Sequence, residues 1–171
     1  MPNHQFKQNK QDEYYTKRYA ILPLIKYLPK NSTIWCPFDK TESKFVEVFL
    51  EFGYKVIHSH INTGQDFFLY EPEEKYDYII SNPPYSLRER ILERLFLLQK
   101  PFAMLINDAG LFDSKKRFQL LSNNKFEIMV FDSRIDYEKN GENMNGVPFK
   151  SIYLCSNILP LQYVFEILNK T

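Results

Sequence analysis

The sequence predicts an α/β fold in which helices cover both faces of a mostly parallel sheet. Short apolar runs alternate with stretches of helical periodicity along the chain, which is typical of repeated βαβ units. One apolar run, Tyr76 to Ser81, ends at two consecutive prolines, which cannot continue a sheet ladder. The last two runs, Phe126 to Phe131 and Lys150 to Cys155, lack a helical crossover between them and predict an antiparallel pair.

In the first half of the chain, a helix is expected from Tyr15 to Leu28, where apolar side chains recur at helical spacing until Pro29 stops it. A β-rich run follows, and then an amphipathic stretch that Gly53 closes. The remaining elements before the double proline are expected as strands at Thr33 to Phe38 and Lys55 to Ile61, a helix at Lys44 to Phe52, a short strand or loop at Asp66 to Leu69, and the strand at Tyr76 to Ser81.

After the double proline, helical periodicity returns from Leu87 to Gln99 and predicts an amphipathic helix. A strand at Phe102 to Ile106 and a shorter helix at Arg117 to Asn123 come next. Residues 132 to 149, between the last two strands, are expected to form a long loop. Structureless loops of this length are uncommon in compact domains and are usually functional or disordered.

Length and composition predict one cytoplasmic domain. Residues 1–13 are polar and are expected to be flexible, and residues 14–171 form a single catalytic domain without a separate target-recognition domain. The net charge is only +1, so any contact with nucleic acid should be local or weak. The two cysteines form no disulfide framework and no metal site, and no apolar run is long enough to span a membrane or serve as a signal core.

The most specific feature is the sequence Asn82-Pro83-Pro84-Tyr85 directly after a buried strand. Ligands of open α/β sheets bind at the carboxyl ends of the strands, and the prolines make this loop rigid and extended. The loop offers an amide side chain, backbone carbonyls and an aromatic ring, which together suit a planar group that carries an NH2. A plain polyproline turn is the alternative interpretation.

The motif resembles that of the amino-methyltransferases that use S-adenosylmethionine, including small phage-type DNA adenine N6 methyltransferases. The resemblance implies a Rossmann-like class I methyltransferase fold with seven strands, one of them antiparallel. It also implies that the Asn82 oxygen and the Pro83 carbonyl accept hydrogen bonds from the target NH2, and that Tyr85 stacks on the planar group. Acceptors that bind those hydrogens more tightly as positive charge develops stabilise the transition state.

The same resemblance implies a cofactor loop after the first strand. Pro37 and Phe38 match the family pattern, whereas Cys36 stands in place of its acid and side chains replace its glycine-rich turn. Asp39, three positions late, is either a substitute acid or the N-cap of the next helix. This departure predicts a cofactor site that is weakened or reshaped.

Further cofactor contacts are expected from five residues. His60 replaces the acid that binds the ribose hydroxyls, or is only a strand residue. A metal site formed by His58 and His60 is not expected, because no third ligand is apparent nearby. Asp66 and Phe67 resemble a Gly-x-Asp-Phe element around the adenine, although Asp66 could equally be a turn residue. Tyr15 and Thr16 belong to a Tyr-Tyr-Thr segment similar to one that borders the methionine end of the cofactor.

The long loop begins with a segment similar to the Arg-Ile-x-Phe/Tyr segment of small phage-type adenine methyltransferases, which a Gly/Asn-rich loop follows. The resemblance implies that Arg134, Tyr137 and Phe149 help to hold the target base, with core packing as the alternative for Phe149. Basic side chains could contact phosphate or simply cover helix surface: Arg88, Arg90, Lys115, Lys116 and Arg117.

These observations predict an S-adenosylmethionine-dependent N6-adenine methyltransferase that acts on nucleic acid, with DNA favoured over RNA. A core this small is expected to use single-stranded or structured targets, a partner subunit or homodimer, or loose specificity. A protein glutamine N5 methyltransferase is the first alternative, because the same motif serves both acceptors. A degenerate fold that acts as a binding module is the second, because the cofactor loop is altered.

Overall fold

The computed structural model describes residues 14–144 and 146–171, and the predicted flexible segment 1–13 lies outside them. Seven strands form the main sheet in the order β2-β1-β3-β4-β8-β5-β9. All neighbouring strands are parallel except β8, which runs antiparallel to β4 and to β5. This arrangement confirms the predicted mostly parallel sheet with one reversed strand.

The strands and helices alternate through the first two thirds of the chain. The strands of the main sheet are β1 (Thr33–Cys36), β2 (Lys55–His58), β3 (Tyr78–Ser81), β4 (Phe102–Asn107), β5 (Glu127–Phe131), β8 (Ser151–Ser156) and β9 (Tyr163–Glu166). The α-helices are α1 (Arg18–Ile25), α2 (Lys44–Glu51), α3 (Arg88–Leu98) and α4 (Lys115–Ser122). Two single 3-10 turns, η2 (Ile61–Thr63) and η3 (Tyr85–Leu87), follow β2 and β3. In residues 14–144 and 146–171, no helix is long and apolar enough to cross a membrane.

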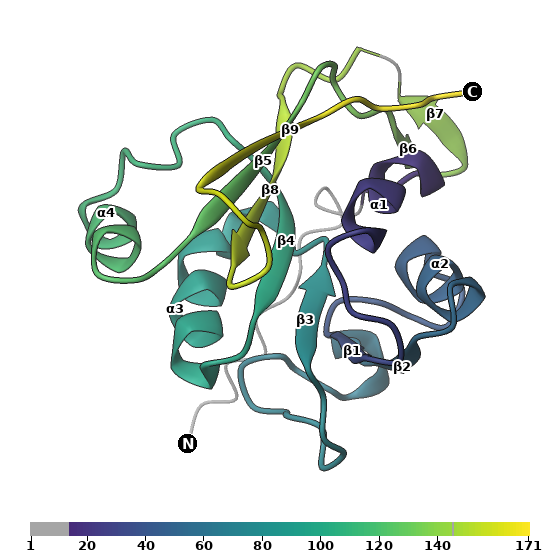
Figure 1. The fold of residues 1–171 in the computed structure, drawn as a ribbon, viewed down its shortest axis with the longest axis horizontal. Helices are drawn as coiled ribbons and strands as arrows, with labels where there is room; N and C mark the ends of the chain where they lie inside the picture. Colours follow the sequence, from purple (N-terminus) through teal and green to yellow (C-terminus); the bar gives the residue numbers. More distant parts are fainter. Residues whose placement is uncertain (1–13, 145) are drawn as a thin grey trace.

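Two helices cover each face of the sheet (Figure 1), with α1 and α2 on one side and α3 and α4 on the other. Because side chains alternate along a strand, neighbouring residues enter different cores. On β3, Ile80 packs with α1 and α2, whereas Ile79 packs with α3 and α4. Both cores are fully apolar at these positions, and this holds the carboxyl end of β3 in the middle of the molecule.

The structure decides one open expectation and corrects three others. Asp66 to Leu69, expected as a short strand or a loop, is a loop with a turn, in which the Asp66 carboxylate accepts a hydrogen bond from the Phe68 N–H (2.9 Å). The first helix begins only at Arg18, because Tyr15 instead pairs with Glu138 in an isolated antiparallel bridge. The predicted long loop contains a hairpin, β6 (Tyr137–Lys139) and β7 (Glu142–Met144). The seventh strand of the sheet is β9, which lies beyond the last predicted strand.

Candidate active site

The Asn82 to Tyr85 segment leaves the sheet at the carboxyl end of β3, between β1 and β4. Pro83 and Pro84 are buried, and Tyr85 begins η3, which leads directly into α3. The order of strand, motif and helix is therefore the predicted one. The two prolines have no N–H to donate and restrict the backbone, so they hold the flanking side chains in place.

The Asn82 amide is fixed by the segment that precedes α1. Its Nδ2 donates one hydrogen bond to the Tyr14 carbonyl and one to the Thr16 hydroxyl oxygen, each 3.1 Å long. The Asn82 Oδ1 is buried and has no hydrogen-bond partner within the described chain. A buried acceptor without a donor costs about 1 to 3 kcal/mol, so this oxygen is ready for an N–H from outside the protein.

An aromatic cluster lies beside this amide. The rings of Tyr14 and Tyr85 are stacked, with centroids 5.9 Å apart and planes inclined by 25°. Phe149 meets both rings edge-on, at 5.7 Å from Tyr14 and 5.6 Å from Tyr85. Tyr137 packs against Phe149 at 5.9 Å. The loop before β8 therefore lies beside Tyr85, as predicted, and the rings of Tyr14, Tyr85 and Phe149 contact one another pairwise.

Hydroxyl groups in and beside the aromatic cluster are hydrogen-bonded to one another. The Tyr85 hydroxyl donates to that of Tyr137 (3.4 Å), and the Tyr137 hydroxyl is hydrogen-bonded to Ser151. Burial raises the pKa of Tyr85 well above its ordinary value and that of Tyr137 to about 12. Both phenols therefore remain neutral at physiological pH, and the site carries no tyrosinate base.

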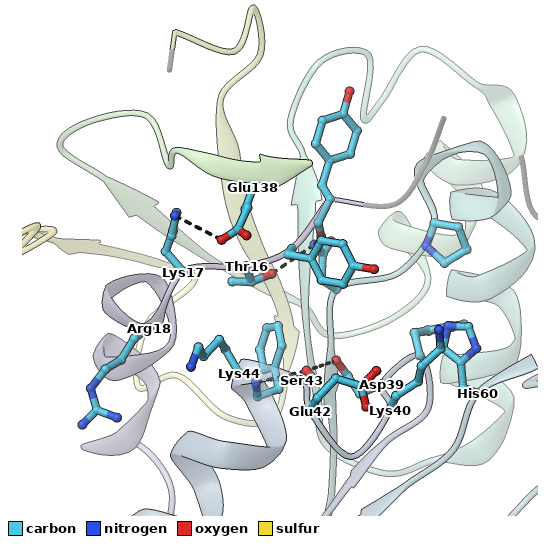
Figure 2. A pocket seen from close by; sticks show the side chains of 16 residues that line it. Thr16, Lys17, Arg18, Asp39, Lys40, Glu42, Ser43, Lys44, His60 and Glu138 are labelled. Atoms are coloured by element: carbon cyan, nitrogen blue, oxygen red, sulfur yellow. Dashed lines mark hydrogen bonds and ion pairs between the residues drawn. The ribbon is translucent and has the colours of Figure 1, made fainter. Parts of the chain in front are cut away.

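A cavity of about 460 Å³ opens next to Asn82. Figure 2 shows Thr16, Lys17 and Glu138 on one side of it, with Asp39 and His60 on the opposite side. Tyr15, which is half exposed, also lines it, and Lys17 forms an ion pair with Glu138 (3.5 Å) at its rim. The volume suits a small-molecule ligand, and the cavity brings Tyr15, Thr16 and Asp39 together with the Asn82 motif.

Asp39 is the acidic group of this cavity that is buried most deeply, with 7 % of its surface exposed. Its carboxylate accepts hydrogen bonds from the hydroxyls of Ser43 and Ser81. Burial raises the pKa of Asp39 from 3.8 to about 6, although these hydrogen bonds oppose the shift. The N-cap of α2 is Ser43, not Asp39, because the Ser43 hydroxyl accepts the Phe45 N–H.

A second, narrower cavity adjoins the first. Phe38, His60 and Pro84 line both cavities, and Asp66 and Phe67 line only the second. The Phe67 ring packs against Phe38 with centroids 4.9 Å apart. The His60 Nδ1 accepts the Asn62 N–H (3.0 Å), so in the neutral ring Nε2 carries the hydrogen. Pro37 also lines this cavity, which has largely apolar walls and a volume of only about 30 Å³.

Several predicted residues lie away from these cavities. Cys36 is fully buried in the core beneath α1 and α2, and burial raises the pKa of its thiol well above 9. Arg134 is exposed, and its guanidinium donates to the Val147 carbonyl (3.1 Å). Arg88 donates to the backbone carbonyl of Asn107 (2.8 Å), and Arg117 pairs with Glu89 (3.3 Å). These two arginines therefore serve loop structure in this conformation.

Sequence reasoning missed the roles of Tyr14 and Ser81. Tyr14 supplies both a ring and a carbonyl to the site, and Ser81, the residue before Asn82, donates a hydrogen bond to Asp39. The Tyr14-Tyr15-Thr16 resemblance pointed to this segment but only toward the cofactor. The serine in the strand carries no signal in the sequence, because small polar residues at strand ends are common.

No protein-family model matches this chain, and no curated protein sequence matches it. Solved structures match it in fold. A modification subunit of a putative type I restriction enzyme from Vibrio vulnificus YJ016 aligns with a TM-score of 0.57 and 10 % identity, over 94 % of this chain and 48 % of its own. The methyltransferase subunit of a type I restriction-modification system from Streptococcus thermophilus gives 0.50 and 11 %, over 95 % and 49 %.

The chain therefore spans about half the length of each of these two solved structures. At this level of identity the likeness concerns the fold alone. Together with the sheet order and the single reversed strand, it identifies a Rossmann-like class I methyltransferase fold.

Proposed function

We propose that this chain is an S-adenosylmethionine-dependent N6-adenine methyltransferase that acts on nucleic acid, with DNA favoured over RNA. The observation that carries the proposal is the unpartnered, buried Oδ1 of Asn82 at the border between a ligand-sized cavity and an aromatic cluster. An acceptor oxygen in this place requires an N–H donor, and a conjugated amino group supplies one.

The residues of the two cavities fit the cofactor. The Asp39 carboxylate suits the ammonium of the methionine end, and the His60 ring suits a ribose hydroxyl. The narrow cavity has Phe38 and Phe67 as walls and Asp66 among its lining residues, which matches the chemistry of an adenine ring, and its volume of about 30 Å³ has to widen when the ring binds. When bound, S-adenosylmethionine supplies the methyl group that is transferred.

The chain's own contribution to the reaction is to hold the acceptor amine. Asn82 Oδ1 and the Pro83 carbonyl accept its two hydrogens, and these bonds strengthen as positive charge develops on the nitrogen. Groups that bind the transition state more tightly than the ground state raise kcat. The neutral phenols of Tyr85 and Tyr137 place no competing charge nearby.

The aromatic cluster favours a nucleobase over a glutamine side chain. A flat ring, that of Tyr14, stacks on Tyr85 and meets Phe149 edge-on. A nucleobase in that place would keep the same stacking, which is worth about 1 to 3 kcal/mol per base. An aliphatic amide chain would keep only the hydrogen bonds.

Two further observations concern the target. The net charge of +1 favours local contacts with a flexible or partly single-stranded nucleic acid over the wrapping of a long duplex. The two solved structures with this fold are described as subunits of type I restriction systems, and each is about twice as long as this chain. A partner subunit or a second copy is therefore the proposed source of target recognition.

The test begins with calorimetric titration of S-adenosylmethionine, followed by methyl transfer to single-stranded DNA, duplex DNA, RNA and a glutamine-containing peptide. Wild type should bind the cofactor with micromolar affinity and methylate adenine. Asn82→Ala should retain cofactor binding within about twofold and lose about 100-fold to 1000-fold in kcat, by analogy with the loss of one oxyanion-hole donor. Asn169→Ala, an exposed amide near the end of the chain, is the matched control.

Three results would contradict the proposal. A folded protein that binds no cofactor would leave only a binding module or a partner-dependent subunit. Transfer to the peptide but to none of the nucleic acids would establish the glutamine alternative. Full activity in Asn82→Ala would show that the motif does not hold the acceptor.

A further inference from the structure

The orientation of the Asn82 amide decides whether the site can work. The oxygen and nitrogen of an amide have nearly the same size, and the last torsion of an asparagine side chain is only weakly restricted. If the amide turned over, its NH2 would face the acceptor amine and two donors would meet. The protein therefore has to select one of the two orientations.

The Tyr14 to Thr16 segment makes this selection. The Tyr14 carbonyl can only accept a hydrogen bond, so it requires Nδ2 rather than Oδ1 at 3.1 Å. The Thr16 oxygen provides the second acceptor at the same distance, and Thr16 is buried with 7 % of its surface exposed. With both hydrogens of Nδ2 occupied, Oδ1 is left as the group that faces an incoming donor.

The Tyr14 to Thr16 segment is held at its middle residue and at its carboxyl end. Tyr15 exchanges two backbone hydrogen bonds with Glu138, at 2.9 and 3.2 Å, and α1 begins two residues after Thr16. The two acceptors therefore have a fixed position relative to β3. This distinguishes the contact from an ordinary hydrogen bond between two mobile side chains.

We propose that Thr16 is a positioning residue for methyl transfer, because its hydroxyl oxygen, together with the Tyr14 carbonyl, holds the Asn82 amide with Oδ1 toward the acceptor amine. This inference rests on the proposed function and adds to it a residue that touches the catalytic amide. Thr16 also lines the cofactor cavity, so one side chain borders both parts of the site.

The kinetic test compares Thr16→Val, which keeps the shape of the side chain and removes the acceptor, with Thr16→Ser, which keeps the acceptor. Thr16→Val should lower kcat about 5-fold to 50-fold, from one lost hydrogen bond and a less ordered amide, with the KM for cofactor within about twofold of wild type. Thr16→Ser should restore kcat to within about threefold. In an Asn82→Ala background, Thr16→Val should cause no further loss, because its effect passes through that amide.

A structural readout keeps the test independent of activity. In 15N-labelled protein, the side-chain NH2 signals of Asn82 are identified by their absence from Asn82→Ala. Thr16→Val should shift these signals and speed their exchange with water, whereas Thr16→Ser should not. Thr16→Ala provides a second variant without the acceptor should the valine chain unfold at lower temperature than wild type.

The outcomes separate this inference from the proposed function. Unchanged Asn82 signals in Thr16→Val, a rise in cofactor KM without a change in kcat, or full additivity with Asn82→Ala would each overturn the role of Thr16. A different outcome is that the Asn82 NH2 hydrogens exchange faster with water in Thr16→Val while the wild-type protein methylates no acceptor. This result would overturn the proposed function and leave the positioning of the amide established.

Discussion

At the scale of single residues, Asp39 connects the larger cavity to the strand that precedes the Asn82 to Tyr85 segment. Its carboxylate takes hydrogen bonds from Ser43, ahead of α2, and from Ser81, the last residue of β3. Burial disfavours the charged form of a carboxyl group, and it raises the pKa of Asp39 from 3.8 to about 6. At neutral pH the group is mostly ionised and offers the negative charge that an ammonium ligand needs.

This buried acid predicts a pH dependence of stability. Because the pKa of Asp39 is higher in the folded state, the stability due to its protonated form is complete below pH 3.8 and is lost as the pH rises through 6. A shift of this size corresponds to about 3 kcal/mol. Denaturant unfolding measures the free energy of unfolding of wild type and Asp39→Asn from pH 3.5 to 8. This decline should occur only in wild type, whatever the constant difference in unfolding free energy between the two proteins. Parallel curves would mean that Asp39 titrates at its ordinary value.

At the scale of elements, a buried carboxylate organises the chain between β8 and β9. Glu127, the first residue of β5, is 2 % exposed and accepts three backbone N–H groups, those of Asn157, Ile158 and Leu159, at 2.8 to 3.0 Å. Asn157 has a φ of 57°, so the chain turns sharply there. The carboxylate therefore sets the path that brings β9 beside β5.

Glu127→Ala should destabilise the protein by about 3 to 5 kcal/mol, because three backbone N–H groups lose their acceptor at once. For a chain of this length the midpoint of thermal unfolding should fall by roughly 10 °C. Calorimetry or circular dichroism measures it, with Glu142→Ala on exposed β7 as the control expected within about 0.5 kcal/mol of wild type. A midpoint within 2 °C of wild type would show that solvent replaces the carboxylate.

The elements also show where sequence reasoning succeeds and where it fails. β3 and β4 were predictable because each is an apolar run buried from both sides. β9 was missed because it is an edge strand whose side chains alternate between exposed and half-buried, without a buried face. The β6 and β7 hairpin did carry a signal, Asn140-Gly141, both with positive φ as a tight hairpin turn requires.

The candidate site also contains one part that the sequence predicts and one part that it does not. Asn82 to Tyr85 are adjacent in sequence, so a motif could identify them. The partners of the Asn82 amide lie 66 and 68 residues away, and that contact depends on how the segment before α1 crosses the cavity. Neither composition nor periodicity contains this information.

At the scale of the whole molecule, the aromatic cluster beside Asn82, which is the proposed acceptor site, is built by segments from three distant parts of the chain. Tyr14 comes from the start of the described chain, Tyr85 from its middle, and Phe149 from the segment before β8. The Tyr14 ring already stacks on one face of Tyr85, with centroids 5.9 Å apart, and Phe149 meets both rings edge-on. Under the proposed function, an acceptor base that stacks on this face of Tyr85 has to take the place of the Tyr14 ring.

Tyr14→Ala removes this ring but keeps the backbone carbonyl that holds Asn82. The acceptor then no longer competes with an aromatic contact worth about 0.5 to 1.5 kcal/mol, so its KM should fall about 2-fold to 10-fold. Cofactor affinity should stay within about twofold. Steady-state kinetics with an adenine-containing oligonucleotide measures the change, and Tyr163→Ala, a half-exposed tyrosine on β9, is the matched control. A higher KM in Tyr14→Ala would show instead that the ring is a wall that grips the base, and that the acceptor enters without displacing it.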